Sequence, residues 1–227
     1  KAATLARRIS FFGPVKGRES MSEMAELIWV AHRLYERGQA CGTAGNISLF
    51  QQEGLLISAG GSCFAAMQQT DFCLLDMDGN VLTGGRPSKE WPIHMALYRL
   101  FGNKGVVIHT HGFYTALWSC LPGLNRQNPI PAYTPYLNMT VGKVQLVPYA
   151  EPGSKELFDL FEKSVHIDAR AYLLAHHGAV VYANTAMLAF SMIEEVENAA
   201  RLAWCLRQTE VPQISQGSLE YKSNSNN

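Results

Sequence analysis

The sequence predicts a single domain of the mixed α/β class. Segments with apolar residues at helical spacing alternate along the chain with short runs of β-branched and other apolar residues, which is the pattern of helices and buried strands. A length of 227 residues suits one α/β domain. The chain is 47% hydrophobic and only 17% charged, so it contains enough apolar side chains for a core.

The individual elements follow from local signals. Helices are predicted where apolar residues at helical spacing meet a capping residue or a Pro in the first turn, which occurs at residues 24–38, 87–101, 154–161 and 185–207. The first of these helices is preceded by capping-box spacing from Ser20 to Glu23. Short apolar runs predict strands at residues 55–57, 106–108, 144–147 and 171–175, and a hairpin over 72–82 that turns at Asp78-Gly79. A glycine-containing loop is expected at 41–48 and a Pro-rich connection at 121–135.

These elements imply one domain with weakly structured ends. We expect an N-terminal extension at residues 1–20, the domain itself at 21–210, and a disordered tail at 211–227, because Ser, Gln, Gly, Asn and Lys dominate the last residues.

Charge and cysteine content limit the functional class. Nineteen basic residues balance nineteen acidic ones, so the chain has no net field that would attract nucleic acid or an anionic membrane. Its apolar runs are shorter than the roughly 18 residues of a membrane span, and no signal-peptide segment is recognisable near Lys1. Five cysteines without a CxxC pair are typical of reduced thiols. We therefore expect a cytoplasmic protein that acts on a small molecule.

Histidines at the ends of two predicted strands indicate a metal site. His109 and His111 follow the run 106–108, and alternate residues of a strand project from the same face. The run 171–175 ends in His176-His177, and Gly178 leaves room for a metal beside His177. A catalytic zinc site needs three protein ligands and an open position. The two strand ends can supply three nitrogens, which predicts a metalloenzyme.

Other polar residues have simpler interpretations. Adjacent histidines point to opposite faces of a strand, so only one of His176 and His177 is expected to bind the metal. We assign no role to three further histidines, because a single histidine on an apolar segment is usually a satisfied core residue: His32, His94 and His166. The acidic residues of the last helix are interpreted as a solvated face: Glu194, Glu195 and Glu197.

Two segments are candidate anion sites. The loop Gly42-Thr43-Ala44-Gly45-Asn46 lacks the pattern of a Walker A or GxGxxG motif, and it reads either as a simple turn or as a nest of backbone N–H groups around a small anion. Ser88-Lys89 opens a helix, where free N–H groups, a hydroxyl and an ammonium combine. Together they suggest a phosphorylated small substrate.

These motifs, in this order and spacing, resemble the class II aldolase/adducin family. The motifs are Gly42 to Ser48, Pro87 to Glu90, His109-Thr110-His111 and His177-Gly178, and the likeness runs from about Met24 to Arg207. Within the family the sequence resembles most the 3-oxo-tetronate 4-phosphate decarboxylases, through stretches at residues 61–63, 87–90, 119–121, 134–136 and 146–149. It next resembles L-fuculose-1-phosphate aldolase, through Glu90-Trp91 and His176-His177.

The resemblance implies a fold and an assembly. The fold is an α/β/α sandwich around a central, mainly antiparallel sheet, so residues 21–210 would form a class II aldolase/adducin-like catalytic domain. The family also implies a four-fold homotetramer with active sites between subunits.

The resemblance also implies roles for individual residues. His109, His111 and His177 would bind Zn²⁺ or another divalent ion, and Glu90 would be the acid/base carboxylate. Tyr136 falls near a tyrosine that handles protons from a neighbouring subunit. The positions that grip the substrate and its phosphate would be Asn46, Gly60, Gly61 and Ser88, with Lys89 beside them.

Two departures from the family pattern affect this assignment. Gly60 stands where relatives often have Thr, which removes a hydroxyl from the phosphate site. Lys89 replaces the second serine of the aldolase pattern, as in the decarboxylase branch, and so favours decarboxylation over aldol cleavage.

The chemistry explains why one site suits both reactions. A zinc ion chelated by a carbonyl and an adjacent hydroxyl oxygen stabilises an enediolate, and that enediolate forms whether carbon dioxide or an aldehyde leaves. We therefore expect a zinc-dependent carbon–carbon lyase that decarboxylates a 3-oxo-tetronate 4-phosphate. The alternatives are an aldolase for a ketose 1-phosphate such as L-fuculose 1-phosphate, a non-catalytic adducin-like interaction module, and an iron oxygenase using His109, His111 and Glu90.

Overall fold

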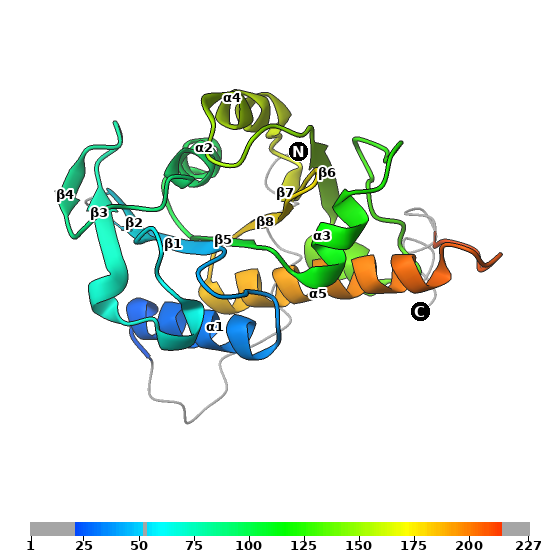
Figure 1. The fold of residues 1–227 in the computed structure, drawn as a ribbon, viewed down its shortest axis with the longest axis horizontal. Helices are drawn as coiled ribbons and strands as arrows, with labels where there is room; N and C mark the ends of the chain where they lie inside the picture. Colours follow the sequence, from blue (N-terminus) through cyan, green and yellow to red (C-terminus); the bar gives the residue numbers. More distant parts are fainter. Residues whose placement is uncertain (1–20, 52–53, 215–227) are drawn as a thin grey trace, which may run out of the picture.

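The computed structural model describes residues 21–51 and 54–214 (Figure 1). The predicted extension at 1–20 and residues 215–227 of the predicted tail lie outside this range, as does Ser20. Residues 211–214 of that tail are described, and the backbone N–H of Ile214 donates to the carbonyl of Ala132 at 2.8 Å.

One eight-stranded sheet forms the centre of the molecule. Its strand order is β4-β3-β2-β1-β5-β8-β7-β6, and every neighbouring pair is antiparallel except β6 and β7. The strands are β1 (Asn46–Gln51), β2 (Gly54–Ser58), β3 (Phe72–Leu75), β4 (Val81–Thr83), β5 (Val106–Thr110), β6 (Lys143–Val147), β7 (Ala169–Leu174) and β8 (Gly178–Ala183). Because β1, β5 and β8 are central, their ends lie near the middle of the molecule.

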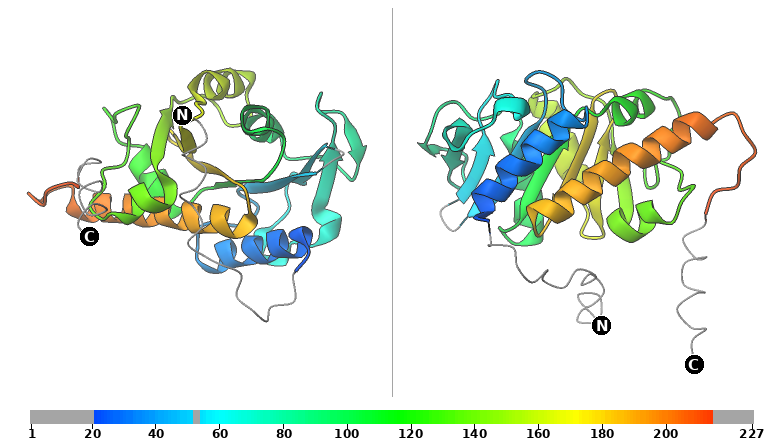
Figure 2. Two further views of the ribbon diagram at one scale, coloured as in Figure 1. Left: turned by 180° about the vertical axis from the view of Figure 1, so that it is seen from behind. Right: turned by 90° about the horizontal axis from the view of Figure 1, so that it is seen from below.

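Helices cover both faces of the sheet, as Figures 1 and 2 show. On one face lie α1 (Glu23–Glu36), α3 (Phe113–Ser119) and α5 (Ala186–Leu206), with the short turns η2 (Phe64–Ala66) and η4 (Leu137–Val141). On the other lie α2 (Trp91–Phe101) and α4 (Lys155–Ser164), and the short turn η3 (Gln69–Asp71) precedes β3. Two buried apolar layers result, one on each side. The predicted α/β/α sandwich with a mainly antiparallel sheet is confirmed.

The helix ends follow from capping. The hydroxyl of Ser22 accepts a hydrogen bond from the N–H of Ala25 at 3.2 Å, so α1 is capped by Ser22, whereas the sequence spacing had suggested Ser20. Ser154 caps α4 in the same way, as predicted, and Thr185 caps α5. At the C-terminal end of α2, Gly102 adopts a φ of 91°, a left-handed conformation that suits glycine.

Sequence analysis missed three elements around the site. Asn46 to Ser48 belong to strand β1 and not to the expected loop at 41–48, and β8 and α3 have no counterpart among the predicted elements. All six residues of β8 are buried, so the strand shows none of the polar alternation that marks a half-exposed strand. Because β1 begins at Asn46 and pairs with β5, Asn46 lies directly opposite His109.

In the part of the chain that the structure describes, no helix combines the length and apolarity needed to cross a bilayer.

Candidate metal centre and active site

Three histidine side chains converge at one end of the central strands. His109 lies in β5, His111 follows the end of that strand, and His177 lies in the turn between β7 and β8. The Nε2 atoms of His109 and His111 are 2.9 Å apart, and those of His109 and His177 are 3.3 Å apart. The structure thus brings together the three histidines that the sequence indicated as metal ligands.

The protonation of these rings fits a cation. His109 Nδ1 donates to the carbonyl of Ala179 at 2.9 Å, so its Nε2 carries a lone pair. Burial lowers the pKa of His109 well below its usual value and lowers that of His111 to about 4, and the neighbouring histidines act in the same direction. Burial also lowers the pKa of His177. The imidazoles are therefore neutral at pH 7, and each ring has a nitrogen lone pair that can bind a cation.

The spacing of the nitrogens also fits a metal. In a tetrahedral zinc site with Zn–N bonds of about 2.0–2.1 Å, two ligand nitrogens lie about 3.3–3.4 Å apart. The observed 2.9 and 3.3 Å are close to that value. Three neutral nitrogens and one open side match the donor set of a catalytic zinc ion.

The turn before β8 explains why His177, and not His176, joins the cluster. His176 is exposed, has a positive φ of 54°, and packs edge-on against Tyr149. Ser119 holds both residues, because its carbonyl accepts from the N–H of His176 and its hydroxyl accepts from the N–H of His177, each at 3.2 Å. Sequence analysis did not identify this role of Ser119. Gly178 is required at the next position, since a Cβ there would lie 2.3 Å from the carbonyl oxygen of Thr110.

Glu90 faces the histidine cluster from the start of α2. Only 5% of the residue is exposed. Its Oε2 lies 3.3 Å from His109 Nε2, and its Oε1 lies 3.6 Å from His177 Nε2. The amide Nδ2 of Asn46 donates to Oε2 at 3.0 Å. A carboxylate is thus positioned beside the open side of the candidate metal centre, as the sequence predicted.

A cavity of about 520 Å³ opens onto this cluster. Its lining includes Glu90, His111 and His177, and all five residues predicted to bind substrate: Asn46, Gly60, Gly61, Ser88 and Lys89. The Lys89 ammonium lies at the surface and donates to the carbonyl of Pro152 at 2.8 Å. Sequence analysis missed Arg86, a second cation in the lining. Among residues 21–51 and 54–214, Arg86 forms no ion pair, so its guanidinium is available to a ligand.

Tyr136 does not line this cavity. It precedes η4 and is 57% exposed. Within one chain its phenol therefore does not reach the cavity, and its role from a neighbouring subunit stays a prediction.

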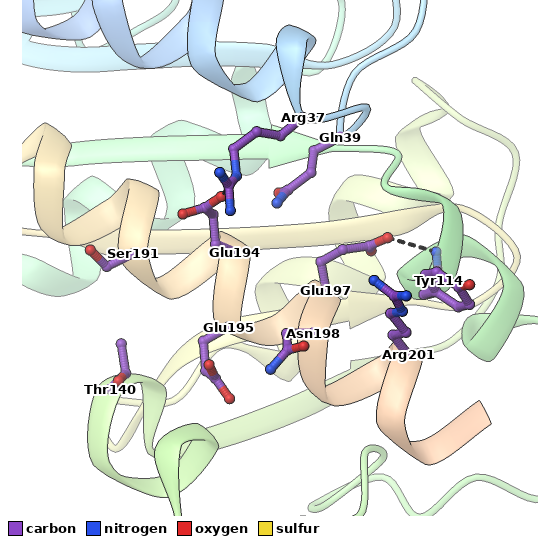
Figure 3. A pocket seen from close by; sticks show the side chains of 10 residues that line it. All are labelled: Arg37, Gln39, Tyr114, Thr140, Ser191, Glu194, Glu195, Glu197, Asn198 and Arg201. Atoms are coloured by element: carbon purple, nitrogen blue, oxygen red, sulfur yellow. Dashed lines mark hydrogen bonds and ion pairs between the residues drawn. The ribbon is translucent and has the colours of Figure 1, made fainter. Parts of the chain in front are cut away.

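A second cavity of about 660 Å³ lies between α1, α3, η4 and α5 (Figure 3). Its lining includes the three acidic residues of α5 that the sequence suggested were a solvated face: Glu194, Glu195 and Glu197. That interpretation is wrong. Glu194 forms an ion pair with Arg37, and burial raises the pKa of both Glu194 and Glu195. Glu197 accepts hydrogen bonds from the first turn of α3.

Comparison with known proteins identifies the family. Residues 25–204 match the Class II Aldolase and Adducin N-terminal domain, and the chain belongs to this family. It is 37% identical over 206 residues to the 3-oxo-tetronate 4-phosphate decarboxylase of Escherichia coli strain K12, covering 90% of this chain and 95% of the relative.

Solved structures agree with this assignment. The crystal structure of YgbL from Klebsiella pneumoniae superimposes with a TM-score of 0.82 at 33% identity, covering 89% of this chain and 99% of that one. A structure of L-fuculose 1-phosphate aldolase gives a TM-score of 0.75 at 29% identity, covering 89% of this chain and 95% of that one. The relatives are named as decarboxylases and aldolases, which are lyases that act on carbon–carbon bonds, and this confirms the predicted enzyme class.

Proposed function

We propose that the chain is a zinc-dependent decarboxylase of a 3-oxo-tetronate 4-phosphate. The observation that carries the proposal is a cavity that opens onto three convergent histidines and a buried carboxylate and is also lined by two cations, Arg86 and Lys89. A sugar-acid phosphate carries two anionic groups, a carboxylate and a phosphate, and two separate cations match that charge. The similarity to the E. coli decarboxylase supports the same substrate class.

The residues around the cavity would bind the metal ion and the substrate phosphate. His109, His111 and His177 would hold the metal ion, which would supply a Lewis acid at the substrate carbonyl oxygen. The backbone at Gly60 and Gly61, with the hydroxyl of Ser88, would contact the phosphate. Gly60, Gly61 and Ser88 line one cavity together with His111 and His177, which supports that arrangement.

Glu90 would handle the proton. Loss of carbon dioxide from the β-keto acid leaves an enediolate, which needs one proton at carbon to become dihydroxyacetone phosphate. Glu90 Oε2 accepts a hydrogen bond from Asn46, so Oε1 is the oxygen that would carry this proton. Tyr136 of a neighbouring subunit would assist in the assembled enzyme, for which we propose a cytoplasmic homotetramer.

The cavity also bears on the alternatives. An iron oxygenase that used only His109, His111 and Glu90 would give His177 no function, although its Nε2 lies 3.3 Å from that of His109. A non-catalytic interaction module would not need a buried carboxylate beside three neutral imidazoles. An aldolase reaction would use the same residues, so these residues do not distinguish the two lyases. A comparison of substrates is needed to distinguish them.

The decisive experiment is metal analysis followed by a substrate comparison. Purified protein is assayed for dihydroxyacetone phosphate released from D- and L-configured 3-oxo-tetronate 4-phosphates and from L-fuculose 1-phosphate. We expect about one zinc ion per chain and faster turnover of a sugar acid. Preferred cleavage of the ketose phosphate would replace the decarboxylase with an aldolase, and activity that survives complete metal removal would reject the metal's role.

A further inference from the structure

A chain of buried hydrogen bonds runs from the core to Glu90. Tyr98 Oη lies 2.8 Å from Ser48 Oγ, which lies 2.6 Å from His94 Nδ1. On the other side of the ring, His94 Nε2 lies 2.5 Å from Asn46 Oδ1, and Asn46 Nδ2 lies 3.0 Å from Glu90 Oε2. His94 and Tyr98 are both 0% exposed. The imidazole to which sequence analysis gave no role is thus one residue removed from the candidate catalytic carboxylate.

The direction of each hydrogen bond follows from the chemistry of the groups. The amide Nδ2 of Asn46 donates to Glu90 Oε2, so its Oδ1 is the atom that faces His94 Nε2. Nε2 of His94 must then carry a proton to donate. Burial lowers the pKa of His94 to about 3, so the ring is neutral and its Nδ1 is an acceptor. Ser48 donates to that nitrogen and accepts from Tyr98.

From this chain of contacts we propose that His94 is a positioning residue for the active site. Its Nε2–H holds the Asn46 amide in the one orientation that directs Nδ2 toward Glu90 and the cavity. Glu90 Oε2 is thereby kept as a hydrogen-bond acceptor, and Oε1 is left to exchange the proton. The part of this inference that concerns turnover rests on the proposed function, whereas the part that concerns the amide orientation does not.

The alternative is that His94 only fills a polar position in the core under α2. Both roles would make its loss destabilising, so stability cannot separate them. They differ in two other respects. A positioning role requires the Nε2–H tautomer, and it requires that His94 act on turnover only through Asn46.

The first test reads the tautomer in the intact, zinc-loaded protein. Long-range ¹H–¹⁵N spectra, with His94 assigned by comparison with His94→Gln, should show a protonated Nε2 and an unprotonated Nδ1 from mildly acidic to neutral pH. The ¹⁵N-labelled side-chain amide of Asn46, assigned with Asn46→Ala, should exchange slowly with water. An Nδ1–H tautomer, an imidazolium or a rapidly exchanging Asn46 amide would overturn the proposal, whatever substrate the enzyme uses.

The second test separates positioning from packing by a double-mutant cycle. His94→Leu should lower the turnover of the best lyase substrate by roughly 10- to 100-fold, the loss typical when a residue that orients an active-site group is removed. Zinc content and KM should change little. His94→Gln, which can still donate to Asn46, should recover most of the turnover.

The cycle is completed in the Asn46→Ala background, where His94→Leu should cost no further activity. Losses that multiply in the double variant would mean that His94 acts independently of Asn46, and this would reject the positioning role. If His94→Leu does not fold, the tautomer measurement and the exchange rate of the Asn46 amide still decide. If none of the three sugar phosphates is turned over, the proposed function fails, and the tautomer and the Asn46 exchange rate still test the inferred amide orientation.

Discussion

Glu197, which lines the second cavity, binds the backbone of Tyr114, three residues after His111 of the candidate metal centre. Glu197 Oε1 accepts a hydrogen bond from the backbone N–H of Tyr114 at 2.8 Å (Figure 3), and its Oε2 accepts from the N–H of Thr115 at 2.9 Å. These amides belong to the first turn of α3, where N–H groups have no partner within the helix. Gly112 is packed so closely that an added Cβ would lie 2.4 Å from Glu197 Oε2. The carboxylate therefore fixes the backbone that directly follows His111.

This geometry predicts that Glu197 affects the metal without touching it. Glu197→Gln removes the charge and one of the two acceptor oxygens, so the turn after His111 should loosen. We expect zinc affinity, measured by competition with a chromogenic chelator, to fall roughly 10-fold. The control is Glu195→Gln, on the same helix and in the same cavity, which should bind zinc normally. Equal losses in the two variants would show a general effect of charge in that cavity.

The sequence predicted the pair His109 and His111 well because its signal is local, since alternate residues of a strand project from one face. His177 lies 68 positions from His109, so its place beside them rested on the second strand end and on the family resemblance. The sandwich fold was predicted through the family resemblance. Local propensity did not show β8, because a fully buried central strand lacks an alternating pattern. It did not show β1 because Asn46 and Ser48 directly continue a glycine-containing loop motif.

The supporting residues could not be predicted in this way. The contacts of Ser119 with His177, and of His94 with Asn46, join residues 58 and 48 positions apart. Such pairs depend on the order of strands in the sheet, which spacing within a segment does not reveal. For the same reason Glu197 looked like part of a solvated face, although it reaches an element that sequence analysis had not found.

The position of Glu90 predicts that binding and chemistry can be separated. Glu90→Gln preserves the size of the side chain and can still contact Asn46, so zinc content and substrate binding should remain. Turnover should fall roughly 10²- to 10⁴-fold, which is the usual contribution of general acid–base catalysis. Steady-state kinetics and metal analysis on the same samples provide the test. Turnover close to the wild-type rate would remove Glu90 from the mechanism.

The histidine pKa values predict how pH affects the metal-free protein. His111, with a pKa lowered to about 4, and His94, lowered to about 3, are neutral when folded, whereas an unfolded histidine titrates near 6.5. Between these values the unfolded chain binds more protons, so the free energy of unfolding must decrease as pH falls from about 6.5 toward 4. Urea denaturation across this range measures the slope. His94→Gln should reduce it, and an unchanged slope would contradict a neutral, buried His94.

The exposure of Tyr136 predicts complementation between subunits. If each site takes Glu90 from one chain and Tyr136 from another, Glu90→Gln and Tyr136→Phe subunits should each be weakly active alone. Unfolding and refolding the two variants together should restore part of the activity, because some sites would receive both intact residues. Mixing two batches of Glu90→Gln protein is the control. A fully active monomer by light scattering would contradict the shared site.

Arg86 and Lys89 predict how the enzyme distinguishes its substrates. The Lys89 ammonium is anchored on Pro152, and an added Cβ at Gly153 would lie 2.4 Å from Lys89 Cδ, so the side chain is held at the rim of the cavity. Such a fixed cation suits the carboxylate of a sugar acid, while Arg86 is left for the phosphate near Gly60. Lys89→Ser should therefore reduce kcat/KM roughly 10-fold for 3-oxo-tetronate 4-phosphates, the cost of one charge-assisted hydrogen bond. The same change should lower kcat/KM for L-fuculose 1-phosphate, which has no carboxylate, much less.

Arg86→Gln should lower kcat/KM for both substrates alike, because both carry a phosphate. Equal losses in Lys89→Ser would make Lys89 a second phosphate contact, and a selective loss of the sugar acid in Arg86→Gln would exchange the two roles.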